Sequence, residues 1–304
     1  MKIDEIYVVA TRSDIRFGRA CIASIRYFHP DIPIRLLKDE IFGAFDTREL
    51  ERHFQVETVQ APQRIWGWGF AKFYPLMLPP GRRVLILDSD ILFTHPLLQR
   101  LEQYDEDFIV ASEPDWPDYE DYVRRAYFVA DKLEAFSPGF ERRLTFNGGQ
   151  VVANTGLLTR EDFEHYVEFS EPVTVKRPDV FPCGEQGITN HLVNLKLARG
   201  EITARALDFM LWADSPRLPH DLPARDGGAD GIESYMLAHY TSHKKIYPWK
   251  MKGKALYTAF EDLYYHQLPL GWLLERWRFL QPLTAHQKLS LKQRIKKILQ
   301  ALRA

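Results

Sequence analysis

Two aspartates at the end of an apolar run are the residues of this 304-residue chain best suited to chemistry. Val84 to Leu87 is a run of four apolar residues, and Asp88, Ser89 and Asp90 follow it directly. Such a run predicts a buried parallel strand, and open α/β sheets bind ligands beyond the carboxyl ends of their strands. Two carboxylates held close repel each other unless a cation lies between them, so the pair predicts a hard divalent metal ion. A metal at such an edge commonly holds phosphates, which favours an enzyme acting on a nucleotide or nucleotide-sugar.

Two other interpretations of the aspartate pair are less favoured. Solvated turns often contain Asp-x-Asp, but the apolar strand in front of this pair argues against a plain turn. Phosphatases of the haloacid dehalogenase type also place Asp-x-Asp after a strand. They normally do so on the first strand and have an adjacent acidic pair later in the chain. Here three strands are expected first, and no later acidic pair lies at a convincing strand end.

Four more segments carry polar side chains that could join such a site. They are Phe70–Tyr74 with Lys72, Phe146–Asn154 with Asn147 and Gly148, Gly184–Asn190 with Glu185 and Gln186, and His239–Lys245 followed by Pro248 and Trp249. Each also has a plainer interpretation. A lysine on a helix is often merely exposed, an asparagine or glycine can serve only the strand, a glutamate favours a helix N-terminus, and a histidine can be structural.

Alternating strands and helices are expected to position these segments. The apolar patterns predict strands over 6–10, 32–37, 56–59, 84–88, 108–111 and 146–154, and helices over 14–28, 47–54, 70–78, 160–169 and 184–195. Residues 214–231 are rich in Pro, Gly and Asp and predict a loop. This alternation predicts an α/β fold with a parallel or mostly parallel sheet.

Taken together, the five segments resemble glycosyltransferase family 8, over about residues 6–249. This family contains glycogenin and the bacterial lipopolysaccharide galactosyl- and glucosyltransferases. The resemblance implies a GT-A fold, which is a single Rossmann-like nucleotide-binding domain with a mixed, mostly parallel sheet. It also implies a UDP-sugar donor, Mn²⁺ (or Mg²⁺) as cofactor, and retention of the anomeric configuration.

The resemblance also implies a role for individual residues. It assigns the metal to Asp88, Asp90 and His239, the diphosphate to Lys245, the surroundings of the donor to Thr11, Lys72 and Asn147, and a place beside the reacting sugar to Gln186. We add Asp88, Ser89, Gly148 and Lys245 as expected donor contacts, and Glu185 and Lys245 beside Gln186 as expected catalytic residues. Gln186 matches the amide near the anomeric carbon. No strong nucleophile is obvious beside it, which favours same-face attack by the acceptor with the leaving phosphate taking its proton. The rival is a covalent glycosyl-enzyme intermediate, for which Glu185 is the candidate.

Three positions differ from the family pattern. Glu185-Gln186 replaces the usual Asp-Gln, Ser242 replaces a glycine, and two residues separate Lys245 from Pro248. The stretch from 113 to 143, rich in acids and aromatics, is either a solvated helical excursion or a lid that binds the acceptor.

Composition and charge exclude several classes of protein. The net charge of −1 lacks the basic balance of a nucleic-acid-binding protein. Cys21 and Cys183 lie far apart, so no disulfide framework is expected and a reducing compartment fits best. The charged start of the chain predicts no signal peptide, and no apolar run is long enough to span a membrane. These features predict a cytoplasmic protein.

The end of the chain differs from the rest. Residues 276–304 contain eight Lys or Arg and no Asp or Glu, which leaves a net charge of −9 on the residues before them. Leu291, Ile295, Ile298 and Leu302 follow helical spacing, so this tail predicts a basic amphipathic helix on the anionic inner membrane surface. The alternative is a helix that docks on the acidic body. We therefore expect a transferase domain over 1–255 and a helical tail over 256–304.

The expected function is transfer of a hexose from a UDP-sugar to a glycan or glycolipid acceptor, in lipopolysaccharide or surface polysaccharide assembly. Two alternatives remain: a transferase acting on a protein or soluble glycan, and a non-catalytic protein that binds a sugar nucleotide.

Overall fold

The main sheet is mixed and mostly parallel, as predicted. The computed structural model describes residues 1–59, 66–67, 69–112, 118–229, 231–241 and 250–278. In these residues seven strands form the main sheet, in the spatial order β10 (Ala204–Leu207), β6 (Phe108–Ser112), β7 (Phe146–Asn154), β4 (Arg83–Asp88), β1 (Glu5–Thr11), β2 (Ile34–Asp39) and β3 (Val56–Thr58). Strands β4, β1, β2 and β3 are parallel to one another, whereas β7 is antiparallel to both of its neighbours.

A second, smaller sheet begins directly after the aspartate pair. Its strands are β11 (Met210–Trp212), β12 (Leu237–His239) and β5 (Ile91–Phe93), in that spatial order. β12 is parallel to β11 and antiparallel to β5. None of these three-residue strands is predicted by the sequence pattern, because three residues are too few to show a period.

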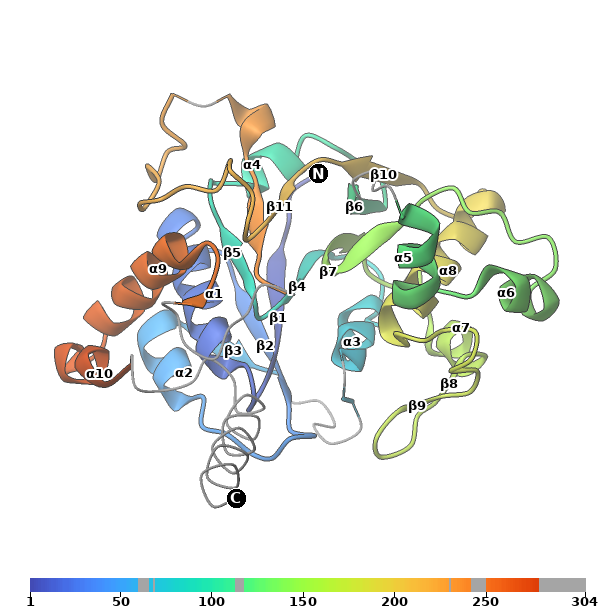
Figure 1. Cartoon of the computed structure of the whole chain (residues 1–304), viewed down its shortest axis with the longest axis horizontal. Coiled ribbons are helices and arrows are strands. Elements are labelled where there is room, and N and C mark those ends of the chain that lie inside the picture. The colour runs from blue at the N-terminus through green and yellow to red at the C-terminus, as the bar shows by residue number, and fades with distance from the viewer. Residues whose placement is uncertain (60–65, 68, 113–117, 230, 242–249, 279–304) are drawn as a thin grey trace, which may run out of the picture.

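Helices cover both sides of the main sheet (Figure 1). They are α1 (Ile15–Phe28), α2 (Arg48–Phe54), the 3₁₀ helix η1 (Phe70–Lys72), α3 (Phe73–Leu76), α4 (Leu98–Leu101), α5 (Tyr119–Ala126), α6 (Ala130–Phe136), α7 (Arg160–Glu164), α8 (Glu185–Ala198), the 3₁₀ helix η2 (Ile232–Ser234), α9 (Lys254–His266) and α10 (Gly271–Arg278). In Figure 1, α1, α2, α9 and α10 lie on one side of the sheet, and α5 to α8 lie on the other.

Burial of the sheet on both faces explains the apolar runs in its strands. Successive side chains of β1 alternate between two hydrophobic clusters: Ile6 and Val8 belong to one, and Tyr7 and Val9 to the other. A strand with two buried faces reads as a continuous apolar run rather than an alternating one. The same applies to β4, whose four apolar residues lead to Asp88.

Helix α9 packs on α1 through a buried ion pair. Arg16 Nη2 donates to Glu261 Oε2 at 3.0 Å, and the Tyr257 hydroxyl donates to Glu261 Oε1 at 3.1 Å. Tyr257 and Phe260 also belong to the hydrophobic cluster on this side of the sheet. Helix α9, which begins close to the predicted domain boundary at residue 255, thus packs directly on α1. The division of the chain at that boundary remains a prediction.

Two predicted elements differ from the structure. The helix expected over 160–169 ends at Glu164, because β8 (Val167–Glu168) pairs instead with β9 (Thr174–Val175). The helix expected over 70–78 is a 3₁₀ turn followed by the short α3. Residues 214–229 contain neither helix nor strand, which agrees with the predicted loop. Among the described residues, no helix combines the length and apolar character needed to cross a membrane.

Candidate functional site

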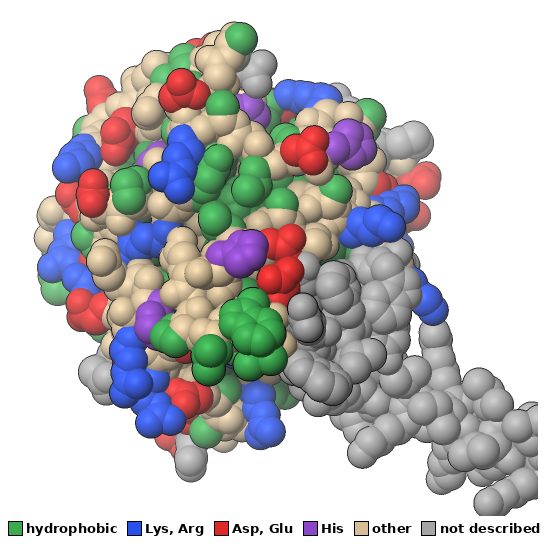
Figure 2. All heavy atoms as spheres, turned by 90° about the vertical axis from the view of Figure 1, so that its left-hand side faces the viewer, with side chains coloured by type: hydrophobic (Ala, Val, Ile, Leu, Met, Phe, Trp, Pro, Cys, Tyr) green, Lys and Arg blue, Asp and Glu red, His purple; other side chains and the backbone are tan. Residues whose placement is uncertain are grey.

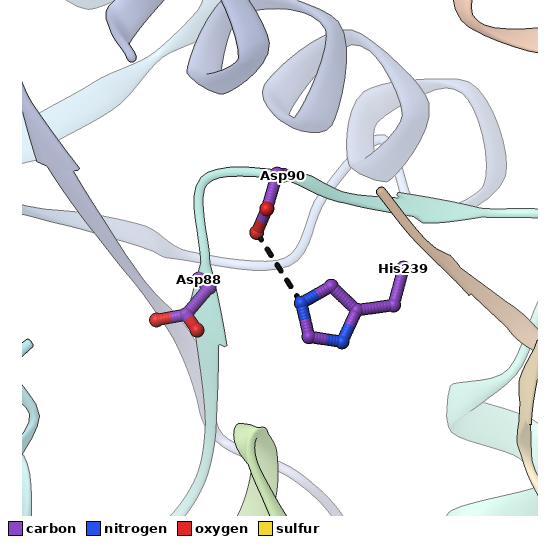
Figure 3. Close-up of side chains that lie close together, drawn as sticks. All are labelled: Asp88, Asp90 and His239. Carbon is purple, nitrogen blue, oxygen red and sulfur yellow. Dashed lines mark ion pairs between the residues drawn. The ribbon is translucent and has the colours of Figure 1, made fainter. Parts of the chain in front are cut away.

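Asp88, Asp90 and His239 converge at one edge of the main sheet. Asp88 ends β4, and Asp90 lies in the turn that leads to β5. His239 ends β12, where it pairs with Ile91 across the small sheet. One ligand atom from each of the three residues lies within 4.8 Å of the others. The Nε2 of His239 lies 3.5 Å from Asp90 Oδ1 (Figure 3). The predicted trio is thus a compact group of two carboxylates and an imidazole.

The surroundings of this group suit a bound cation. Asp90 and His239 are buried, and the His239 ring stacks on Trp212 with centroids 5.1 Å apart at an interplanar angle of 20°. Space beside the group depends on Gly149, where a Cβ atom would lie 2.8 Å from His239 Cε1 and 3.1 Å from Asp88 Oδ2. Two carboxylates plus an imidazole form a donor set for a divalent metal ion. The residues present therefore fit the implied metal.

Lys72 joins the metal group to a second carboxylate. Its ammonium lies 3.1 Å from Asp88 Oδ1 and 2.8 Å from Glu185 Oε2, and it donates to the Gly148 carbonyl oxygen at 2.9 Å. Burial alone would lower the pKa of Lys72, but the two carboxylates outweigh it and raise that pKa above its ordinary value. Lys72 is therefore a buried cation between two carboxylates and not an exposed helix residue.

Glu185 starts α8 and is also buried. Burial raises the pKa of Glu185 to about 7, against the opposing effect of Lys72. Its carboxylate faces Lys72 and Thr189, and it is not among the described residues that line the cleft. Glu185 thus contacts the site through Lys72.

Gln186, the next residue, is held at both ends of its amide. Its Oε1 accepts from the Gly148 backbone N–H at 2.9 Å, and its Nε2 donates to the Ala126 carbonyl at 3.1 Å. Asn147 Oδ1 accepts from the Gly149 N–H at 2.8 Å. These bonds connect the start of β7 to α8 and to the end of α5. They bring Asn147, Gly148 and Gln186 together with the metal group.

A cleft of about 590 Å³ opens over these residues. Its described lining is formed by Asp88, Tyr122, Ala126, Asn147, Cys183, Gln186, Trp212, Asp214, His239 and Thr241. Tyr122 and Ala126 come from α5, within the stretch 113–143 for which two interpretations were open. At least this helix of the stretch contributes to the cleft wall.

The remaining predicted residues lie at different distances from the cleft. Thr11 ends β1 at the same sheet edge as Asp88, and its backbone N–H donates to Asp14 Oδ1 at 2.7 Å. Ser89 is buried and lies close to α1: a Cβ atom added at Gly18 would be 3.7 Å from the Cβ of Ser89. Lys245 and Ser242 lie outside the described residues.

Several site residues are not found by sequence reasoning. Gly149 is the clearest, because the tight position beside His239 is Gly149 and not its neighbour Gly148. The available signal is the period of a strand: adjacent residues face opposite ways, so only one of two consecutive glycines can face His239. Trp212 and Asp214 lack any local pattern. Tyr122 lies in the stretch 113–143, for which an acceptor-binding lid is one of the two interpretations.

Comparison with known proteins supports the fold. No protein-family model and no curated protein matches this sequence. The structure is similar to that of the galactosyltransferase LgtC in complex with donor and acceptor sugar analogues, with a TM-score of 0.52 and 17% identity over 89% of this chain and 99% of that chain. It is also similar to the apo structure of the bifunctional glycosyltransferase WbbM, with a TM-score of 0.50 and 13% identity over 88% of this chain and 49% of that chain.

At these identities the likeness shows a shared fold. The predicted GT-A fold is therefore confirmed: the chain has the α/β fold of solved glycosyltransferases, with two carboxylates and an imidazole at the edge of its sheet.

Proposed function

We propose that this chain is a glycosyltransferase that moves a hexose from a UDP-sugar to a glycan or glycolipid acceptor. The observation that carries the proposal is the group of Asp88, Asp90 and His239 at the carboxyl edge of a glycosyltransferase fold, where Asp88 and His239 line a cleft. This is where open α/β sheets bind nucleotides.

Asp88, Asp90 and His239 would hold the cofactor. Carboxylates suit both Mn²⁺ and Mg²⁺, and the imidazole favours the softer Mn²⁺. When bound, the cation would offset the charge that builds on the diphosphate as the sugar–phosphate bond breaks. Lys245 is proposed to contact the same diphosphate, with Thr11, Lys72, Ser89, Asn147 and Gly148 as the other donor contacts.

Retention by same-face attack fits the positions of the polar groups. Gln186 lines the cleft, and two hydrogen bonds fix its amide. This neutral side chain is proposed to lie near the anomeric carbon. Glu185 is buried and paired with Lys72, which makes it a poor nucleophile. In this mechanism the acceptor hydroxyl attacks as UDP leaves, and the leaving phosphate oxygen takes its proton. If a covalent intermediate forms instead, mass spectrometry of the denatured enzyme will find a hexose on Glu185.

The acceptor is proposed to enter beside α5, because Tyr122 and Ala126 line the cleft there. An aromatic side chain suits the apolar face of a sugar ring. We further propose that the acceptor belongs to lipopolysaccharide or surface polysaccharide assembly, and that the tail over 276–304 keeps a cytoplasmic protein at the inner membrane surface.

UDP release separates this proposal from its non-catalytic alternative. A transferase without acceptor is expected to hydrolyse its UDP-sugar slowly and only with Mn²⁺ present. Tight binding of a UDP-sugar with no release of UDP, alone or with any glycan or glycolipid acceptor tested, would instead support a sugar-nucleotide-binding protein. Transfer to a protein or soluble glycan alone would support the remaining alternative.

A further inference from the structure

The part of β7 beside the metal group lies where the pairing of the main sheet is interrupted. The register with β6 shifts between Val110 and Ser112, where a step of two residues along β6 corresponds to a step of five along β7. On its other edge, β7 pairs with β4 only from Gln150 onward. Within the residues that the structure describes, residues 147–149 therefore have no partner in either neighbouring strand. Gly149 of this segment packs against the metal group, so contacts other than sheet pairing must hold it there.

Helix α8 makes such contacts through three amide side chains on one face. Gln186, Asn190 and Asn194 are spaced four residues apart, so their side chains project from the same side of the helix. Gln186 Oε1 accepts from the Gly148 backbone N–H at 2.9 Å. Asn190 Oδ1 accepts from the Phe146 backbone N–H at 3.0 Å, and its Nδ2 donates to the Phe146 carbonyl oxygen at 2.9 Å. The backbone of β7 is thus bonded on both sides of residue 147.

Asn194 repeats this arrangement one turn further along α8. Its Oδ1 accepts from the backbone N–H groups of Arg143 and Leu144 at 2.7 and 2.8 Å, and its Nδ2 donates to the Leu144 carbonyl oxygen at 2.8 Å. Each asparagine also donates to the carbonyl oxygen of the residue four positions earlier in α8, which fixes the orientation of its own amide. Side chains of α8 therefore take the place of a neighbouring strand along residues 143–148.

Burial makes these bonds obligatory. On the side of the molecule that carries α9 and α10, charged side chains lie at the surface, where they meet solvent (Figure 2). Asn190 and Asn194 are 0% exposed. Loss of either amide would leave backbone groups of residues 143–148 unsatisfied inside the protein, and a fully bonded buried network fixes one arrangement of the groups that it joins.

The two asparagines differ in how near their partners lie to the cleft. Asn190 holds Phe146, directly before residues 147–149, and also bonds the backbone carbonyl of Gln186 at 2.9 Å. Asn194 holds residues that precede β7. We propose that Asn190 is a positioning residue for sugar transfer, which through Phe146 sets where residues 147–149 lie beside the metal group and Gln186. This inference rests on the proposed transferase function. In it, Asn194 contributes to stability alone.

A matched pair of alanine variants of the full chain tests the proposal. Asn190→Ala and Asn194→Ala each remove a fully buried amide that bonds several backbone groups, so urea unfolding should show similar losses of stability. At saturating Mn²⁺, kcat for UDP release from a UDP-sugar is expected to fall about 30-fold in Asn190→Ala, with a smaller change in KM, and at most about threefold in Asn194→Ala. Calorimetric titration should show about tenfold weaker Mn²⁺ binding by Asn190→Ala and little change in Asn194→Ala.

A measurement on the wild type keeps the proposal testable if Asn190→Ala does not fold. Hydrogen exchange should find the Phe146 N–H as protected as the amides inside β4, because the Asn190 side chain accepts from it. Rapid exchange of this N–H would overturn the proposal. So would wild-type kcat and Mn²⁺ affinity in Asn190→Ala, or equal losses of kcat in the two variants at equal stability, which would show that both amides serve the fold alone. If the wild type releases no UDP from any UDP-sugar, the proposed function fails, and the Mn²⁺ affinities still decide whether Asn190 positions the metal group.

Discussion

The two sides of Asp88 differ in the source of the positive charge that balances the carboxylates. Toward α8, Asp88 and Glu185 share the ammonium of Lys72, so the protein provides its own cation. Toward β12, Asp88 and Asp90 lie beside the imidazole of His239. The first side resembles a structural ion pair, and the second resembles a site built for a metal. One carboxylate can therefore contribute to stability on one side and to ligand binding on the other.

Loss of Asp90 should produce the largest effect, and it should fall on function. Asp90→Ala is expected to lower kcat/KM for transfer by about 10³-fold, or about 4 kcal/mol, because the leaving diphosphate would lose its cation. Thermal unfolding without metal should stay near wild type, since removing one of two facing carboxylates relieves repulsion. The control is Asp208→Ala, at an exposed aspartate, which should leave kcat/KM unchanged. Retained Mn²⁺-dependent transfer by Asp90→Ala would contradict the assignment.

Loss of Lys72 should act on stability. Lys72→Met leaves the Glu185 and Asp88 carboxylates without their buried cation and is expected to lower the free energy of unfolding by about 3 kcal/mol. Adding Glu185→Met should restore part of that loss, because the pair is then replaced by apolar groups. Urea unfolding of the two single variants and the double variant measures this. Additive losses would show that the two residues do not interact as described.

The two adjacent glycines give the sharpest matched pair. A Cβ on Gly149 would lie 2.8 Å from Asn147 Oδ1 and from His239 Cε1, whereas a Cβ on Gly148 meets nothing closer than 3.4 Å. Gly149→Ala is therefore expected to weaken Mn²⁺ binding by about 30-fold, roughly 2 kcal/mol, and Gly148→Ala by much less. Calorimetric titration with Mn²⁺ checks both. A larger effect of Gly148→Ala would mean that the cleft is shaped differently from our description.

The stacked tryptophan should have the smallest effect. Trp212→Ala removes the ring that packs on His239 and is expected to weaken Mn²⁺ binding by about tenfold, or about 1.4 kcal/mol, by freeing the imidazole. Trp212→Phe should recover much of the affinity, because a phenyl ring can still stack. Equal affinities of the wild type and both variants would show that the stacking does not orient His239.

The sequence predicts those helices and strands whose own residues show a local pattern of apolar and polar side chains. Strand β4, the nine-residue β7 and the start of α8 are found because apolar runs and helix signals span them. The junction of His239 with Asp90 is not found by pattern alone, because it depends on β12 pairing with β5 across some 146 residues. The resemblance names both residues but not the pairing that unites them.

Other features depend on long-range packing and stay hidden in the sequence. The Lys72–Glu185 pair joins η1 to α8, and each residue alone suggests only a helix position. The end of α7 at Glu164 is set by the pairing of β8 with β9, which competes with a continued helix. Gly149 differs from Gly148 only in the face of β7 that it occupies.

Calorimetric binding of a panel of UDP-sugars, with and without Mn²⁺, tests the central claim most directly. We predict that wild type binds one donor of the panel only when Mn²⁺ is present, and that Asp90→Ala binds none. Binding of no UDP-sugar under any metal condition, or equal binding by Asp90→Ala, would contradict the assignment of Asp88, Asp90 and His239 as the metal site of a UDP-sugar transferase.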